Sequence, residues 1–141
     1  MRPDPRDHRE TLDAARALTA AGRPAEGFAM VAAWFADPEH AATPQPGATA
    51  LHEVAQAAGA NGDDDLALRA LNLALAWVDW ADLRYMRGVL HARHGALEPA
   101  RADLDRALAI NPRYRAAALE RALLEARLGR VGDAMSALRA F

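Results

Sequence analysis

The stretch that decides the fold is DLRYMRGVLHARHGALEPARADLDRALAINP, residues 82–112. It contains a glycine followed by small and apolar residues at fixed spacing, which are Gly95, Ala100, Leu104, Ala107 and Pro112. The first three members of this set return 34 residues later as Gly129, Ala134 and Leu138. Such a repeat indicates stacked helical hairpins, because a single hairpin cannot bury its apolar face alone.

Earlier copies of the set extend the repeat toward the N-terminus. One copy lies 33 residues upstream and consists of Gly62, Ala67, Leu71 and Ala74. A weaker copy, spaced 40 residues from the next, consists of Gly22, Gly27, Val31 and Trp34. A glycine after a helix lets the chain turn at positive φ, and small residues in the returning helix let two backbones approach closely.

The composition favours helix and excludes several classes of chemistry. Ala and Leu dominate the apolar residues of the 141-residue chain, which predicts an all-α fold. The chain has no Lys and no Cys, so it has no Schiff-base lysine, no P-loop lysine, no thiol nucleophile and no thiolate metal site. Its net charge of −2 disfavours binding to nucleic acid. We expect no cofactor.

The expected helices follow the apolar spacing and the glycine and proline signals. They span residues 7–21, 24–36, 48–60, 63–78, 81–94, 98–110, 113–128 and 130–141. We expect an extended connection over 39–47, which carries Pro44 and Pro46, and a helix cap at the aspartates 63–65. The residues from Met1 to Glu10 contain neither a signal peptide nor a membrane span, so we expect a cytoplasmic protein that does not contact membranes.

Residues 82–112 resemble a tetratricopeptide repeat of the version that carries Arg-Gly in its first helix and closes with Ala-Leu-x-x-Asn-Pro. The resemblance implies a right-handed α-solenoid of about four hairpins in one domain, residues 1–141. Its parts would be a divergent repeat at about 8–37, a linker at 38–47, and repeats at 48–80, 81–114 and, truncated, 115–141. It also implies a protein-binding scaffold that is not an enzyme and has no catalytic residues.

The same resemblance implies that the first helix of each hairpin lines a concave groove. In this register the candidate groove residues are His52, Gln56, Tyr85, Val89, Arg93, Leu123 and Arg127, with Leu12, Arg16 and Leu119 beside them. Arg93 and Arg127 occupy equivalent positions, where two guanidinium groups can hold carboxylates. The alternative is that both are ordinary solvated arginines. The Lys, Asn and Arg clamp of some family members is not carried over, because this chain has no Lys.

Arg84, Arg87, His91 and His94 form one stripe where the family often has apolar groups. The two histidines are one turn apart and Glu98 follows, which is one possible start of a metal or acid/base site. A zinc site needs three or four convergent ligands, so we predict no metal. The alternative is that Arg87 pairs with Asp103 or Asp105 on the returning helix.

The helix expected over 24–36 has no charged side chain after Glu26, and the next outward helix is also rich in leucine. Exposed apolar surface of this size is typical of interaction sites. The candidate oligomer or partner surface consists of Phe28, Met30, Trp34, Leu66, Leu73 and Trp77. The alternative is that the proline-rich loop and the neighbouring hairpins cover these residues.

The last expected helix has only a thin polar strip of Asp133, Ser136 and Arg139, whereas solenoids usually end in a polar capping helix. Three things could cover this helix: a second copy of the chain, as in a homodimer, a partner protein, or a downstream segment. The sequence therefore predicts a scaffold that binds a protein or peptide. The alternative function is a regulatory domain that captures a small acidic ligand or signalling peptide through Tyr85, Arg93 and Arg127.

Overall fold

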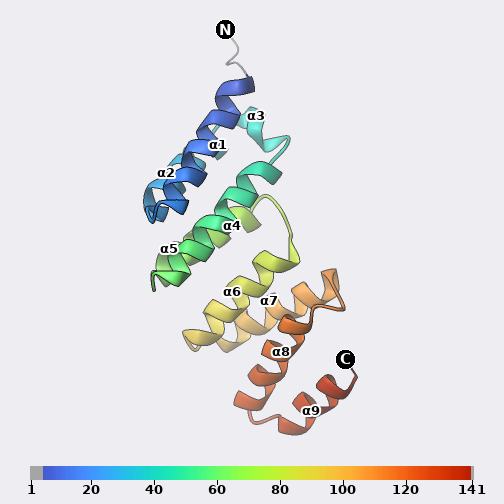
Figure 1. Ribbon diagram of the computed structural model, residues 1–141. Helices are drawn as coiled ribbons and strands as arrows, with labels where there is room; N and C mark the ends of the chain where they lie inside the picture. Colours follow the sequence, from blue (N-terminus) through green and yellow to red (C-terminus); the bar gives the residue numbers. More distant parts are fainter. Residues whose placement is uncertain (1–4, 141) are drawn as a thin grey trace. The chain divides into compact units, whose positions relative to one another are not determined.

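The computed structural model describes residues 5–140, with the side chains of 9–40 and 42–140, and confirms the all-α prediction. These residues form nine helices and no strand (Figure 1). The helices are α1 (Pro5–Ala20), α2 (Pro24–Phe35), α3 (Pro38–Ala41), α4 (Gln45–Ala60), α5 (Asp64–Leu75), α6 (Ala81–Arg93), α7 (Leu97–Ile110), α8 (Arg115–Arg127) and α9 (Val131–Arg139). The chain divides into two compact units, 1–78 and 79–141, which we call unit 1 and unit 2.

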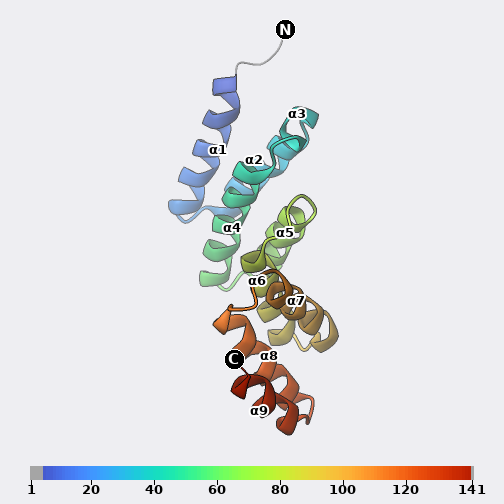
Figure 2. The same ribbon diagram turned by 90° about the vertical axis from the view of Figure 1, so that its right-hand side faces the viewer.

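Unit 1 consists of two helical hairpins and the short helix α3. Helices α1 and α2 form one antiparallel pair and α4 and α5 form the other, and α4 also contacts both helices of the first pair (Figures 1 and 2). The interior is made of fully buried aliphatic side chains, which include Val31, Leu51, Val54 and Leu71. Burial of such faces is the main favourable contribution to folding.

Unit 2 repeats the arrangement with two more hairpins. Helix α6 pairs with α7, α8 pairs with α9, and α8 also contacts both α6 and α7 (Figure 2). A buried cluster joins α6, α7 and α8 through Ala92, Ala100, Leu104, Ala107, Ala117 and Leu124. Three of the residues that define the repeat in the sequence, Ala100, Leu104 and Ala107, are therefore buried at the contacts between these helices.

Every hairpin turn has a glycine at positive φ, as the repeat predicted. The values of φ are 83°, 77°, 77° and 80° at Gly22, Gly62, Gly95 and Gly129. A second kind of glycine permits close approach of two helices. A Cβ added at Gly88 would lie 3.0 Å from Cγ of Leu104, so the absence of a side chain there lets α7 pack directly on α6.

The expectation of an extended connection over 39–47 was wrong. Helix α3 begins at Pro38, and the Asp37 side chain caps it by accepting a hydrogen bond of 3.0 Å from the backbone N–H of Glu39. Helix α4 already begins at Gln45, with Pro46 in its first turn. Proline is tolerated in a first turn because its missing N–H has no partner within the helix there. The prolines in this segment therefore open helices.

The predicted cap at the aspartate run is confirmed, since the Asp63 carboxylate accepts a 3.1 Å hydrogen bond from the backbone N–H of Leu66. The last helix ends at Arg139, and Phe141, which we expected within it, lies outside the described residues. Within the part of the chain that the structure describes, no helix is both long and apolar enough to cross a membrane.

Candidate functional site

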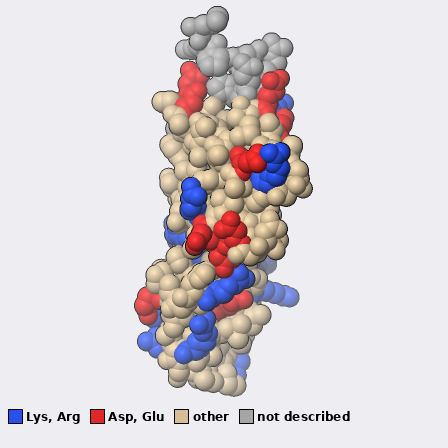
Figure 3. Space-filling view, turned by 90° about the vertical axis from the view of Figure 1, so that its left-hand side faces the viewer, with Lys and Arg blue, Asp and Glu red and all other residues tan. Residues whose placement is uncertain are grey.

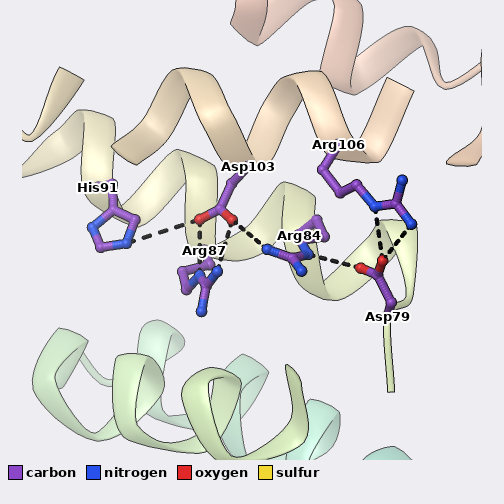
Figure 4. A network of polar contacts seen from close by, with 6 residues as sticks. All are labelled: Asp79, Arg84, Arg87, His91, Asp103 and Arg106. Atoms are coloured by element: carbon purple, nitrogen blue, oxygen red, sulfur yellow. Dashed lines mark hydrogen bonds and ion pairs between the residues drawn. The ribbon is translucent and has the colours of Figure 1, made fainter. Parts of the chain in front are cut away.

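The Arg and His stripe on α6 surrounds a buried carboxylate on α7. Asp103 is only 3% exposed. Its two oxygens accept hydrogen bonds of 2.8 Å from Nε and Nη2 of Arg87, and a third bond of 3.2 Å comes from Nη1 of Arg84 (Figure 4). The expected pairing of Arg87 with Asp103 is confirmed, and the stripe serves to hold α6 on α7. A two-pronged Arg–carboxylate contact also fixes the rotation of one helix against the other.

A second carboxylate extends this network to the start of α6. Asp79 accepts a 2.8 Å hydrogen bond from Nε of Arg84 and a 2.7 Å bond from Nε of Arg106 on α7 (Figure 4). The hydrogen bond from Arg84 is the main reason that the pKa of the Asp79 carboxyl lies below its usual value. The pKa of Arg84 is raised, because its two carboxylate partners outweigh the effect of burial.

The two histidines of the stripe do not converge with Glu98 on a common point. His91 lies 3.9 Å from Oδ2 of Asp103, and His94 is exposed in the turn after α6. Over the described residues, no group of three or more His, Cys, Asp or Glu side chains is arranged to hold a metal ion. His91 lies at the edge of the arginine and carboxylate network.

A further ion-pair network, which the sequence did not reveal, joins α7, α8 and the turn before α9. Glu125 on α8 is 5% exposed and accepts a short hydrogen bond from Arg121. Arg101 and Arg130 approach the same carboxylate to 3.6 and 3.5 Å. Burial raises the pKa of Glu125, but the hydrogen bond and charge of Arg121 outweigh it and lower the pKa overall. The only sequence signal was the i,i+4 spacing of Arg121 and Glu125.

The first helices of unit 2 form an open groove, which we call the first-helix groove. It has a volume of about 470 Å³ and is lined by Ala92, Glu120, Leu123, Leu124, Ala126 and Arg127. Leu123 is 51% exposed, and Leu119, one turn earlier, is 50% exposed. Two of the predicted groove residues, Leu123 and Arg127, therefore line this groove.

Arg127 also contacts α6, and the remaining groove candidates of unit 2 have other neighbours. Nη1 of Arg127 donates a 2.9 Å hydrogen bond to the Ala92 carbonyl and so ties α8 to the end of α6. Tyr85 packs against Tyr114 with ring centroids 5.1 Å apart, and its pKa is raised by burial and by the charge of Glu120. Val89 is half-buried and Arg93 is exposed.

The first helices of unit 1 carry a more polar hollow of about 420 Å³, lined by Arg16, Thr19, Ala20, Glu53, Gln56 and Ala57. Arg16 makes a two-pronged ion pair with Glu53, with nitrogen-to-oxygen distances of 2.7 to 3.1 Å. Gln56 lines this hollow, His52 is half-buried, and Leu12 is part of the core. The guanidinium group of Arg16 is thus already neutralised within the unit.

The outward apolar residues of unit 1 divide into buried and exposed groups. Trp34 and Leu66 are 6% and 5% exposed and belong to the interior. Phe28, Met30 and Leu73 are half-buried, with the guanidinium of Arg69 lying 4.9 Å above the Phe28 ring. Trp77 is 39% exposed and stacks on Phe35 at 5.4 Å. The aromatic residues of α2 are therefore covered largely by α3, α4 and the end of α5.

Helix α3 is the element that covers Trp34. The His40 ring stacks on Trp34 with centroids 4.1 Å apart and shares a hydrogen bond with the Trp34 carbonyl oxygen. A Cβ added at Gly47 would lie 2.5 Å from Cζ3 of Trp34, so the start of α4 also touches the indole. Nε1 of Trp34 is buried without a hydrogen-bond partner.

The surface carries charges of both signs. On the face drawn in Figure 3, basic and acidic side chains are interspersed among uncharged ones, in line with the net charge of −2. A mixed face of this kind does not create a field of one sign.

No protein-family model matches the chain, and no curated protein matches it. Among solved structures, it is similar to a crystal structure of MamA, with a TM-score of 0.74 and 19% identity over 96% of this chain and 77% of that chain. It is also similar to a tetratricopeptide repeat protein from Parabacteroides merdae ATCC 43184, with a TM-score of 0.75 and 20% identity over 94% of this chain and 51% of that chain.

At this level of identity the likeness concerns the fold. It agrees with the repeat in the sequence, with the glycine at each hairpin turn and with the small residues buried between helices. The chain is an α-solenoid with the fold of tetratricopeptide-repeat proteins.

Proposed function

We propose that this chain is a non-enzymatic scaffold that binds a protein or peptide through the first-helix groove of unit 2. The observation that carries the proposal is the pair of half-exposed leucines, Leu119 and Leu123, one turn apart beside an open groove. Leucines in such a position expose apolar surface to water, and a bound partner would remove that surface from water.

The groove chemistry selects the type of partner segment. Leu123 offers apolar contact, Arg127 offers guanidinium N–H groups, and Glu120 disfavours a carboxylate at its own position. The preferred segment therefore has an apolar side chain for the leucines and one acidic side chain for Arg127. Such a segment gains its affinity from apolar burial and its orientation from the ion pair.

The scaffold acts in the cytoplasm, needs no cofactor or metal, and also self-associates. Its second helices keep a weaker candidate surface, which consists of Phe28, Met30, Leu73 and Trp77. These residues lie in unit 1 and the groove leucines lie in unit 2. Substitutions in one unit therefore test one surface while leaving the other unchanged.

The test compares proteins captured from the native cell by the full chain and by a Leu119→Ser, Leu123→Ser double variant. The variant should weaken binding of the groove partner about tenfold or more, because hot-spot residues at a binding site each contribute on the order of 1–2 kcal/mol. An Ile110→Ser variant is the matched control, since Ile110 is 38% exposed but does not line the groove.

Loss of a partner by the double variant and its retention by Ile110→Ser support the proposal. Equal capture by the wild type and the double variant contradicts it. Circular dichroism checks that the variants fold, and substitution of half-exposed leucines should change the free energy of unfolding by only about 0.5 kcal/mol each. An Arg127→Gln variant then measures the contribution of the ion pair.

A further inference from the structure

Helix α9 has an apolar face that no described element covers. Val131, Met135 and Leu138 are 54%, 50% and 46% exposed. They follow the i, i+4, i+7 spacing that places side chains on one side of a helix, and we call them the α9 face. Ala134, which lies between them in sequence, is 5% exposed in the hairpin with α8.

The repeat shows what normally covers this face. The counterparts of Leu138 in the three preceding hairpins are Val31, Leu71 and Leu104, and each of them is 0% exposed. Leu104 belongs to a buried cluster that includes Ala117 and Leu124 of α8, which is the first helix of the following hairpin. The natural occupant of the α9 face is therefore a first helix that presents small and apolar residues.

Helix α1 carries small or apolar residues at three of the four corresponding positions. Counted back from the turn glycine, its counterparts of Arg121, Leu124 and Glu125 are Ala14, Ala17 and Leu18, which we call the α1 face, and Glu10 stands in the place of Ala117. Glu10, Ala14 and Ala17 are exposed, and Leu18 is half-buried. Helix α1 contacts α2 and α4 on its other sides.

We propose that the α9 face of one copy of the chain binds the α1 face of a second copy, head to tail. This inference rests on the self-association part of the proposed function and names its surfaces. The contact is heterologous, since two different faces meet, so the assembly grows into a chain or closes into a ring. A small-residue surface lets α9 approach closely, as the alanines of α7 and α8 do within unit 2.

The residue types at the two faces are complementary where the internal junction uses ions. Between α7 and α8, Arg101 lies 3.6 Å from Glu125 and Arg121 lies 2.6 Å from Asp105. The counterparts of Arg101 and Glu125 at the new junction are Met135 and Leu18, so an apolar pair replaces the ion pair.

The second ion pair has no counterpart at the new junction. The counterpart of Asp105 on α9 is Arg139, and the counterpart of Arg121 on α1 is Ala14. A first helix with arginine at the position of Arg121 would repel Arg139, whereas α1 has an uncharged side chain there. The charges therefore favour α1 over α8 as the occupant of the α9 face.

The first experiment measures the mass of the full chain against concentration by sedimentation or light scattering. The wild type should grow in mass from micromolar to millimolar concentration. A tail variant, Met135→Gln with Leu138→Gln, and a head variant, Ala14→Arg with Ala17→Arg, should each show the mass of one chain. All substituted residues are exposed, so the variants should remain folded, which circular dichroism verifies.

The mixture of the two variants gives the decisive result. An equimolar mixture should form a species of two chains and no larger one, because only the intact α9 face of the head variant and the intact α1 face of the tail variant can meet. A head variant that still dimerises alone would show pairing of α9 with α9 and would overturn the proposal. A mixture that remains at the mass of one chain would also overturn it.

The second experiment adds a charge at the junction. Ala14→Arg alone should weaken self-association about tenfold, because it places an arginine opposite Arg139. The double variant, Ala14→Arg with Arg139→Glu, should recover affinity to within about threefold of the wild type. Absence of recovery overturns the assigned pairing.

The two proposals fail separately. A wild type that keeps the mass of one chain at millimolar concentration overturns the head-to-tail contact together with self-association, but leaves capture of the groove partner intact. Self-association that persists in the tail variant overturns the head-to-tail contact alone. The Leu119→Ser, Leu123→Ser variant should assemble like the wild type, and the tail variant should still capture the groove partner. Loss of assembly in the groove variant would show that the groove, and not the α9 face, joins the copies.

Discussion

Unit 1 and unit 2 contain the same hairpin, but different side chains hold their helices together. In unit 1 the aromatic residues Trp34 and Phe35 of α2 pack on each other, and Phe35 stacks on Trp77. Among the described residues, both buried carboxylates, Asp103 and Glu125, lie in unit 2 and are held by arginines. The glycine turns and small residues therefore specify the hairpin, while the side chains around them differ between the units.

The largest expected effect removes the aromatic centre of unit 1. Trp34→Ala should lower the free energy of unfolding by about 3–5 kcal/mol, because Trp34 is 6% exposed and its loss leaves a cavity. Urea unfolding gives the magnitude, and hydrogen exchange resolved by peptide assigns the loss to residues 1–78. Trp77→Ala is the control, since Trp77 is 39% exposed and should cost clearly less.

The corresponding change in unit 2 removes its buried carboxylate. Asp103→Ala should cost about 3 kcal/mol, because Arg84 and Arg87 lose the group that compensates their partial burial. Hydrogen exchange should place this loss in residues 79–141. Asp105→Ala, which removes a half-exposed carboxylate, should cost less than about 1 kcal/mol, and equal losses would contradict the special role of Asp103.

Two glycines on α4 test how tightly the start and the end of this helix are packed in unit 1. Gly47→Ala should cost about 1–3 kcal/mol, because the new Cβ would lie 2.5 Å from Trp34 and 2.6 Å from Phe35. Gly59→Ala adds a methyl group where nothing lies within 4 Å, so it should stabilise the chain by about 0.5–1 kcal/mol through helix propensity. Thermal unfolding of the two variants should shift in opposite directions.

Acid should destabilise unit 2 before unit 1. The folded-state pKa values of Asp79 and Glu125 are lowered by Arg84 and Arg121, so these carboxylates stabilise unit 2 above the ordinary carboxyl pKa of about 4. That stability is lost as the pH falls through the lower folded-state values. In a pH titration followed by hydrogen exchange, residues 79–141 should therefore lose protection before residues 1–78. Simultaneous loss would contradict the comparison.

The smallest expected effect concerns the exposed ion pair of unit 1. Arg16→Ala should change the free energy of unfolding by less than about 1 kcal/mol, because the Arg16 and Glu53 side chains are 50% and 32% exposed. The effect should shrink further as salt is added during urea unfolding. A loss as large as that of Asp103→Ala would show that unit 1 also depends on its ions.

The repeat pattern predicted the parts of the fold that depend on local spacing. Gly62 and Gly95 form the turns within hairpins because these turns need positive φ, and Ala100 and Leu104 are buried because their spacing puts them on one helix face. The pairing of Arg87 with Asp103 was also predictable, since both lie on facing positions of one hairpin. These features require no knowledge of distant contacts.

The features that the sequence missed depend on which elements meet. Trp34 was predicted to lie on the surface, because the α2 helix is apolar on all sides. In the structure, α3 and Gly47 of α4 cover it. Helix α3 was missed because the prolines of this segment were interpreted as helix breakers. The burial of Glu125 required the placement of Arg101, Arg121 and Arg130 from α7, α8 and the turn before α9.

The four glycine turns have a consequence for stereochemistry. A side chain added at Gly22, Gly62, Gly95 or Gly129 would meet no atom within 4 Å, so only the sign of φ opposes an L-residue there. The mirror-image amino acid prefers that sign. A chemically synthesised chain should therefore accept D-alanine at every hairpin turn and become more resistant to unfolding, because its denatured chain has fewer conformations.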